Sequence, residues 1–153
     1  QLSGNPADQG KVEYTQVAGL GDCFYRESDR SIVCISYLGF QVIDATTGDL
    51  AESRVFLEED PDGIGRFDYI YAPNLQGDHF TFLAEMKTDW YGIGRVGIFD
   101  LNARKLLWTE EIIPLEERKA TGNHLVTPQP LYISGDKLYI KDVKDTLHIF
   151  QRE

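Results

Sequence analysis

A five-residue phrase occurs three times in this chain, and it constrains the fold more than any other feature. It reads Phe-Gln-Val-Ile-Asp at 40–44, Val-Gly-Ile-Phe-Asp at 96–100 and Leu-His-Ile-Phe-Gln at 147–151. Corresponding positions are 56 and 51 residues apart, which leaves room for a few short strands and their turns in each interval. Each copy follows a β-rich run, so the phrase predicts repeated sheet units.

The rest of the chain has the pattern of short strands separated by turn residues. One stretch, Pro114 to Asn123, favours one or two helical turns instead. The predicted strands span 11–17, 22–26, 31–38, 40–45, 50–57, 66–72, 79–87, 95–101, 105–113, 129–133, 137–143 and 146–151. Strands at this spacing predict an all-β fold. The length of 153 residues predicts a single domain over 1–153, and we expect residues 1–10 to fray.

Three segments resemble blades of quinoprotein-like and WD-type β-propellers. Segments 42–50 and 98–108 resemble the turn between the third and fourth strands of a blade, and 137–150 resembles its second and third strands. The resemblance implies a propeller-like assembly of three antiparallel sheet units. The Gly-His and Trp-Asp signatures are missing, so it implies no binding residues. Alternatives are a sandwich whose hairpins mimic blades, and chance alternation.

The third unit lacks a fourth strand, because the sequence stops at Glu153 soon after the third phrase. The predicted strand at 11–17 has no partner of its own in this scheme. We therefore expect 11–17 to pair beside 146–151 and close the last unit, which would cover an open sheet edge.

Cys23 and Cys34 flank a polar turn between two β-prone segments. A hairpin folded about Ser28 and Asp29 places the two cysteines directly opposite each other, close enough for a disulfide. A disulfide predicts an oxidising compartment such as the periplasm. The start at Gln1 then fits a mature chain after signal-peptide removal, or a trimmed one. The alternative is two buried free thiols in a cytosolic protein.

The charge balance excludes one class of partner. The chain carries 15 Lys and Arg against 25 Asp and Glu, a net charge of −10. Nucleic-acid phosphates require a basic face, so we expect no nucleic-acid partner. The charge fits a basic protein partner, although solubility alone also explains it. No apolar run approaches the roughly 18 residues that a membrane span needs.

Motifs for catalysis, metals and cofactors are missing or weak. His79 and His148 fall in predicted strands and are expected to be structural, whereas His124 lies in a loop and is a candidate site residue. We find no zinc spacing, nucleophile elbow or phosphate loop, so we expect no metal, no cofactor and no enzyme. The acidic loop at 58–65 fits calcium less well than a solvated or contact loop, because the bidentate Glu is missing.

These features are similar in character to the periplasmic immunity and inhibitor proteins of Gram-negative bacteria. That resemblance implies an acidic module that occludes the active site of a basic secreted hydrolase, either a cell-wall-degrading effector or a lysozyme-like enzyme. The candidate partner-binding residues are Glu58, Glu59, Asp60, Asp62, Asp89, Trp90, Tyr91 and His124. Alternatives are a non-catalytic scaffold in an envelope complex and a hydrolase that uses a carboxylate pair.

Overall fold

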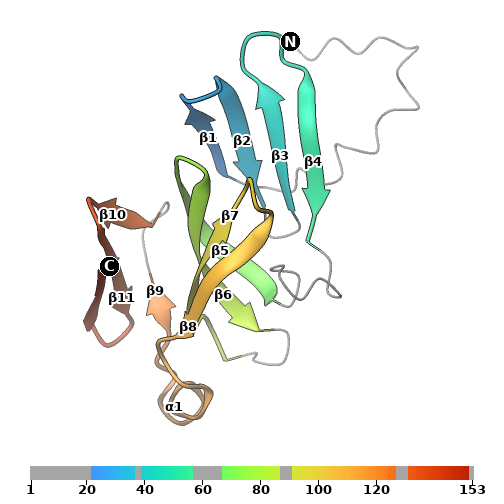
Figure 1. Cartoon of the computed structure of the whole chain (residues 1–153). Helices are drawn as coiled ribbons and strands as arrows, with labels where there is room; N and C mark the ends of the chain where they lie inside the picture. The colour runs from blue at the N-terminus through green and yellow to red at the C-terminus, as the bar shows by residue number, and fades with distance from the viewer. Residues whose placement is uncertain (1–21, 37–38, 57–66, 87–90, 127–130, 152–153) are drawn as a thin grey trace. The chain divides into compact units, whose positions relative to one another are not determined.

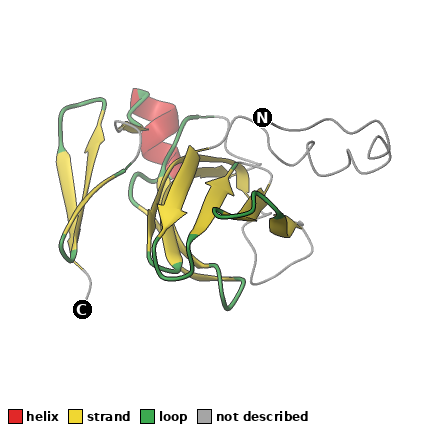
Figure 2. Cartoon of the chain, turned by 90° about the horizontal axis from the view of Figure 1, so that it is seen from above, coloured by secondary structure: helices red, strands yellow, loops and turns green. Residues whose placement is uncertain are grey.

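The computed structural model describes residues 22–36, 39–56, 67–86, 91–126 and 131–151. Strands dominate these residues, and helix α1 interrupts them once in the described part of the chain (Figures 1 and 2). The strands form three four-stranded antiparallel sheets, which confirms the all-β prediction. The chain divides into two compact units, Gln1–Val55 and Phe56–Glu153.

The first unit holds one sheet, with its strands in chain order. It consists of β1 (Asp22–Arg26), β2 (Ser31–Ile35), β3 (Gly39–Asp44) and β4 (Leu50–Val55). Alternate residues of β2 are buried, as expected when one face of a strand packs into a core, whereas β3 is buried at four consecutive positions, Gly39 to Val42. These buried apolar side chains are Val33, Ile35, Phe40 and Val42.

The hairpin of β1 and β2 has the register that the sequence predicted. Cys23 pairs with Cys34, and the two residues form a disulfide with their Cα atoms 4.0 Å apart. The turn is held by Asp29, which accepts hydrogen bonds from the guanidinium of Arg26 and the hydroxyl of Ser31. These charged and hydroxyl donors lower the pKa of the Asp29 carboxyl.

The second unit contains the other two sheets. One has β5 (Phe67–Gln76), β6 (His79–Met86), β7 (Arg95–Asp100) and β8 (Lys105–Glu111) in chain order. Five consecutive residues of β6, from Phe80 to Ala84, are buried, so side chains on both faces of this strand are buried.

The last sheet follows helix α1 (Leu115–Thr121). It consists of β9 (Leu125–Val126), β10 (Tyr132–Ser134), β11 (Lys137–Asp142) and β12 (Leu147–Gln151). Strand β11 is central: β12 pairs along one side of it, and β10 and β9 pair with successive parts of the other side.

The repeated phrase forms the third strand of each sheet at the same register. Its last residue pairs with the first residue of the second strand: Asp44 with Ser31, Asp100 with His79 and Gln151 with Lys137. The phrase therefore marks equivalent strands, as the sequence analysis predicted.

The expected closure of the third sheet is not part of the described structure. Segment 11–17 lies outside the described residues, and within them no strand pairs with the far edge of β12. The sheet obtains its fourth strand differently, because the short β9 pairs with Lys141 and Asp142 of β11. The sequence pattern did not predict β9, since two paired residues leave no periodicity.

Strand β5 corrects another prediction. The segment from Pro73 to Gly77 was expected to separate two strands, yet β5 continues to Gln76 and the turn is only Gly77 and Asp78. A proline has no N–H to donate, so it is tolerated in a strand at an irregularity. Here the register shifts between Tyr71 and Asn74, and Ala72 has a φ of 48°.

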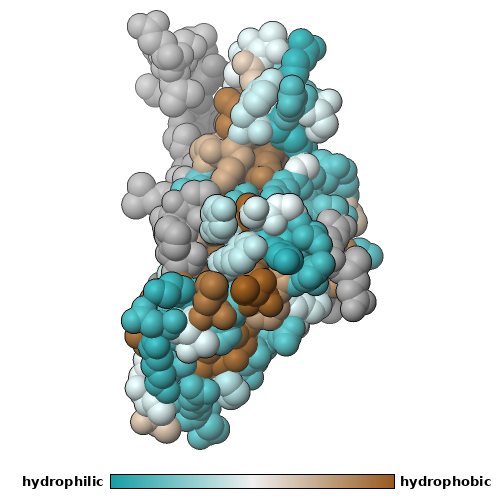
Figure 3. Space-filling view, turned by 90° about the vertical axis from the view of Figure 1, so that its left-hand side faces the viewer, coloured by the Kyte–Doolittle hydropathy of each residue, from teal (hydrophilic) through white to brown (hydrophobic). Residues whose placement is uncertain are grey.

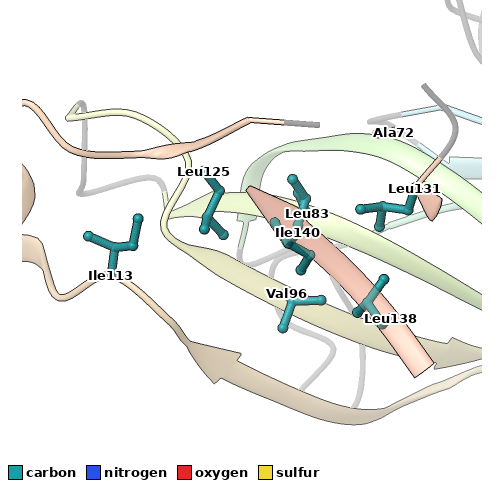
Figure 4. Close-up of a cluster of buried hydrophobic side chains, with 8 residues drawn as sticks. All are labelled: Ala72, Leu83, Val96, Ile113, Leu125, Leu131, Leu138 and Ile140. Carbon is teal, nitrogen blue, oxygen red and sulfur yellow. The ribbon is translucent and has the colours of Figure 1, made fainter. Parts of the chain in front are cut away.

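The core of the second unit joins its two sheets (Figure 4). Its buried members are Ala72, Leu83, Val96, Ile113, Leu125, Leu131, Leu138 and Ile140. Burying a side chain the size of Leu or Ile contributes about 1.5–3 kcal/mol. A backbone hydrogen bond from Leu131 to Ala72 (3.1 Å) and one from Leu125 to Ile93 (2.8 Å) also join the segments of this unit.

Candidate binding surface around helix α1

Three segments far apart in sequence meet at α1. Lys119 on the helix places its ammonium 5.7 Å from the ring centre of Tyr91. The amide of Val143, which follows β11, donates a 3.0 Å hydrogen bond to the carbonyl of His124. We call the surface formed by Tyr91, Lys119, His124, Val143 and Lys144 the α1 surface.

A buried arginine holds this surface together. Arg118 is 1% exposed although it lies on a seven-residue helix. Its guanidinium donates to the carbonyls of Ile113 (3.0 Å) and Gly92 (2.8 Å) and to Glu111 (3.2 Å). Because a guanidinium presents its donors in a rigid plane, it fixes the loop after Tyr91 against the helix.

Two glycines allow the loop to approach so closely. A Cβ on Gly94 would overlap the Arg118 guanidinium and lie 2.9 Å from the carbonyl oxygen of Ile113. A Cβ on Gly92 would lie 2.9 Å from the Cβ of His124, and Gly92 also has a φ of +87°. Both positions therefore require glycine, and Gly92 and Gly94 form a close-packing site.

Asp142 connects α1 to the hairpin between β11 and β12. One of its oxygens accepts from the amides of Lys144 and Thr146, both at 2.9 Å. The other accepts from Asn123 Nδ2 (3.2 Å) and lies 3.2 Å from Nε2 of His148. Burial alone would raise the pKa of Asp142, but these hydrogen bonds outweigh it and hold the pKa well below its usual range.

The same network reaches the surface through Glu117. Asn123 Nδ2 also donates to Glu117 (3.1 Å), which pairs with the ammonium of Lys144 at 3.4 Å. The amide oxygen of buried Asn123 has no hydrogen-bond partner among the described residues. The hairpin at 142–146 is thus tied to α1 by side chains as well as by backbone.

The predicted site residues have different outcomes. Tyr91 is 51% exposed and His124 is partly exposed, and both lie on the α1 surface. The others, Glu58, Glu59, Asp60, Asp62, Asp89 and Trp90, lie outside the described residues. The strand ends next to these two segments are adjacent, however, because Phe67 at the start of β5 pairs with Met86 at the end of β6.

The sequence pattern did not predict several members of the site. Arg118 was missed because charged helix residues usually face solvent, and Asn123 and Asp142 because their partners lie far away in sequence. One signal was present. The glycines at 92 and 94 leave a space of the kind that a large side chain can fill.

The chemistry available to the described residues is limited. No group of three or more His, Cys, Asp or Glu side chains in the described ranges is arranged to hold a metal ion. Glu117 and Asp142 share a donor on Asn123, but Asp142 has a lowered pKa, opposite to the raised pKa of a general acid. No helix in the described part of the chain is both long and apolar enough to cross a bilayer.

Comparisons with known proteins give a structural likeness alone. No family model and no curated protein matches the chain. A solved structure described as "Crystal structure of the computationally designed Ika4 protein" is similar at a TM-score of 0.40 and 12% sequence identity. The match covers 87% of this chain and 92% of that one. At this level of similarity it carries no information on function.

Proposed function

We propose that the chain is a non-catalytic protein-binding module, an immunity or inhibitor protein that occludes the active site of a basic secreted hydrolase. The observation that carries the proposal is the α1 surface. It presents an exposed aromatic residue, Tyr91, on a loop that a buried arginine, Arg118, holds in place. Exposed aromatic side chains on rigid supports are common anchors of protein interfaces.

The acidic sequence beside β5 and β6 also fits a basic partner. Segment 58–62 precedes β5 and segment 89–91 follows β6, and the ends of these strands pair at Phe67 and Met86. Acidic residues attract a basic partner, and the net charge of −10 would speed its approach. The disulfide between Cys23 and Cys34 fits an oxidising compartment, which we propose is the periplasm.

The test is the association rate with basic cell-wall hydrolases at several salt concentrations. Suitable probes are a c-type lysozyme and the hydrolase encoded beside this gene, if there is one. We expect inhibition of one probe and an association rate that falls roughly tenfold or more between low and high salt. A rate that salt does not change would contradict the proposal.

A matched pair of variants locates the contact. We expect Tyr91→Ala to weaken binding about tenfold or more, as loss of an aromatic anchor does. Tyr25→Ala is the control, because Tyr25 is similarly exposed but belongs to the first unit. Equal effects of the two variants, or an effect of Tyr25→Ala alone, would show that the α1 surface is not the binding site.

A scaffold in an envelope complex is the second candidate, and one observation favours it. The face of the β10–β12 sheet that points away from the core exposes Tyr132, Leu147 and Ile149. An exposed apolar face of this kind is typical of assembly proteins. This reading includes a propeller-like arrangement of the three sheets, with 11–17 completing the last one. Purification of the native chain in a stable complex without a hydrolase would favour it.

A further inference from the structure

The sheet of β9–β12 carries apolar side chains on both of its faces. Side chains of β11 alternate strictly: Leu138, Ile140 and Asp142 point into the core, and Lys137, Tyr139 and Lys141 point away from it. We call the second side the outer face. Its apolar members, from four strands, are Val126, Tyr132, Tyr139, Leu147 and Ile149.

This outer face is exposed in the single chain. Tyr132 is 59% exposed and Ile149 is 55% exposed, and the rings of Tyr132 and Tyr139 lie 5.6 Å apart. Figure 3 has this side of the second unit toward the viewer and shows brown hydrophobic side chains gathered among teal polar ones. Exposed clusters of apolar side chains rimmed by polar ones often mark interaction sites.

The charges around the outer face are balanced, unlike those of the whole chain. Lys141 pairs with Asp145 at one end (2.7 Å), and Lys137 and Asp136 lie at the other end. The charges of these two lysines and two aspartates sum to zero, whereas the whole chain has a net charge of −10. A basic partner would therefore gain little electrostatic attraction from the outer face. An identical face turned end for end would place each lysine near an aspartate of the other copy.

We propose that the outer face binds the same face of a second copy of the chain in a two-fold symmetric dimer. A symmetric contact needs a self-complementary surface, and this face is apolar in its centre and has opposite charges at each end. The face has five apolar residues in each copy, fewer than the roughly 20–30 residues a side of a stable interface. We therefore expect a weak dimer, with a Kd of roughly 10 μM to 1 mM.

The test is sedimentation equilibrium of the full chain from about 1 μM to 1 mM, which brackets this Kd range. The average mass should rise from 17.4 kDa toward twice that value and then stop. Ile149→Lys should remain at 17.4 kDa throughout, whereas the control Leu107→Lys, at an exposed site on β8, should dimerise as the parent chain does. A parent chain that remains monomeric, or growth beyond two copies, would overturn the proposal.

Salt separates this proposal from the proposed function. Two copies that each carry a net charge of −10 repel each other, so dimerisation should strengthen as salt is added. Binding of a basic hydrolase should instead weaken as salt is added. If Ile149→Lys loses hydrolase binding and the parent chain does not dimerise, the face belongs to the hydrolase and the dimer is wrong. Loss of hydrolase binding in Tyr91→Ala alone would leave the dimer untouched.

Cross-linking of mixed light and heavy isotope copies gives an independent readout. We expect cross-links between Lys137 of one copy and Lys141 of the other. Cross-links from Lys11 to Lys141 within one copy, with no mixed pairs, would assign the face to the N-terminal segment and overturn the proposal. If Ile149→Lys shows lower stability by circular dichroism, Tyr132→Ser replaces it with the same expected loss of dimer.

Discussion

At the scale of single residues, the polar side chains around α1 are set by distant partners. Arg118 is the clearest example, because its guanidinium donates to Gly92, Glu111 and Ile113. In the local sequence it is one charge in Leu-Glu-Glu-Arg-Lys-Ala-Thr, where every charged residue reads as solvent-facing. Only the positions of the loop and the strand end show that this guanidinium is buried.

We expect Arg118→Met to lower the free energy of unfolding by about 2–5 kcal/mol, because it leaves buried carbonyls without donors. Urea unfolding followed by tryptophan fluorescence measures this change. The control is Lys119→Met on the same helix, whose exposed pair with Glu116 should contribute less than about 0.5 kcal/mol. Similar losses in both variants would mean that the buried hydrogen bonds contribute little.

The lowered pKa of Asp142 predicts a pH dependence of stability. A carboxyl whose pKa is lower in the folded state stabilises the fold above its unfolded pKa, about 3.9, and this contribution is lost as pH falls toward the folded pKa. We expect the difference in free energy of unfolding between Asp142→Asn and the parent chain to be largest at pH 7. This difference should shrink below about pH 4.

Urea midpoints measured from pH 7 down to pH 2 test this expectation. Asp145→Asn is the control, because Asp145 is exposed in the same hairpin and asparagine tolerates its positive φ. A difference between Asp142→Asn and the parent chain that stays constant down to pH 2 would show that the carboxylate charge is not responsible.

At the scale of elements, strand pairing followed the sequence pattern closely where turns were short. The β1–β2 hairpin has the predicted register because a polar four-residue turn left one way to place Cys23 opposite Cys34. Strand β5 does not follow the sequence pattern. Pro73 predicts a break, but the strand continues because the irregularity at Ala72 accommodates the proline. Helix α1 was predicted within 114–123 and spans Leu115–Thr121, ending at Gly122 with a φ of 69°.

The disulfide gives a prediction for this hairpin. We expect Cys23→Ser with Cys34→Ser to lose about 3 kcal/mol of stability, as the loss of a cross-link over 11 residues frees the unfolded chain. Thermal unfolding followed by far-ultraviolet circular dichroism measures the loss. Reducing agent should lower the midpoint of the parent chain toward that of the variant and leave the variant unchanged; an unaffected parent chain would contradict a stabilising disulfide.

At the scale of the whole molecule, charge is the property that the sequence states most directly. A net charge of −10 on 153 residues repels itself in any compact arrangement, so the field opposes folding while favouring a basic partner. The two effects respond oppositely to salt: screening strengthens the fold and weakens attraction to the partner.

We expect the thermal midpoint to rise by about 2–4 °C between 10 and 150 mM NaCl, which corresponds to about 1 kcal/mol for a chain of this size. Differential scanning calorimetry measures the midpoint, and an equal osmolality of sucrose controls for general solute effects. A midpoint that falls with NaCl would mean that attractive ion pairs outweigh the net repulsion.

The sequence by itself determined the all-β class, most strand positions, the repeated third strand and the cysteine pairing. These depend on local periodicity and short turns, which neighbouring residues encode. Only the tertiary structure decided that β9 joins β11, that Arg118 is buried behind Tyr91, and that Asp142 is bonded to Asn123. Such contacts join residues from 15 to 26 positions apart, and no local pattern specifies which distant backbone a polar side chain will meet.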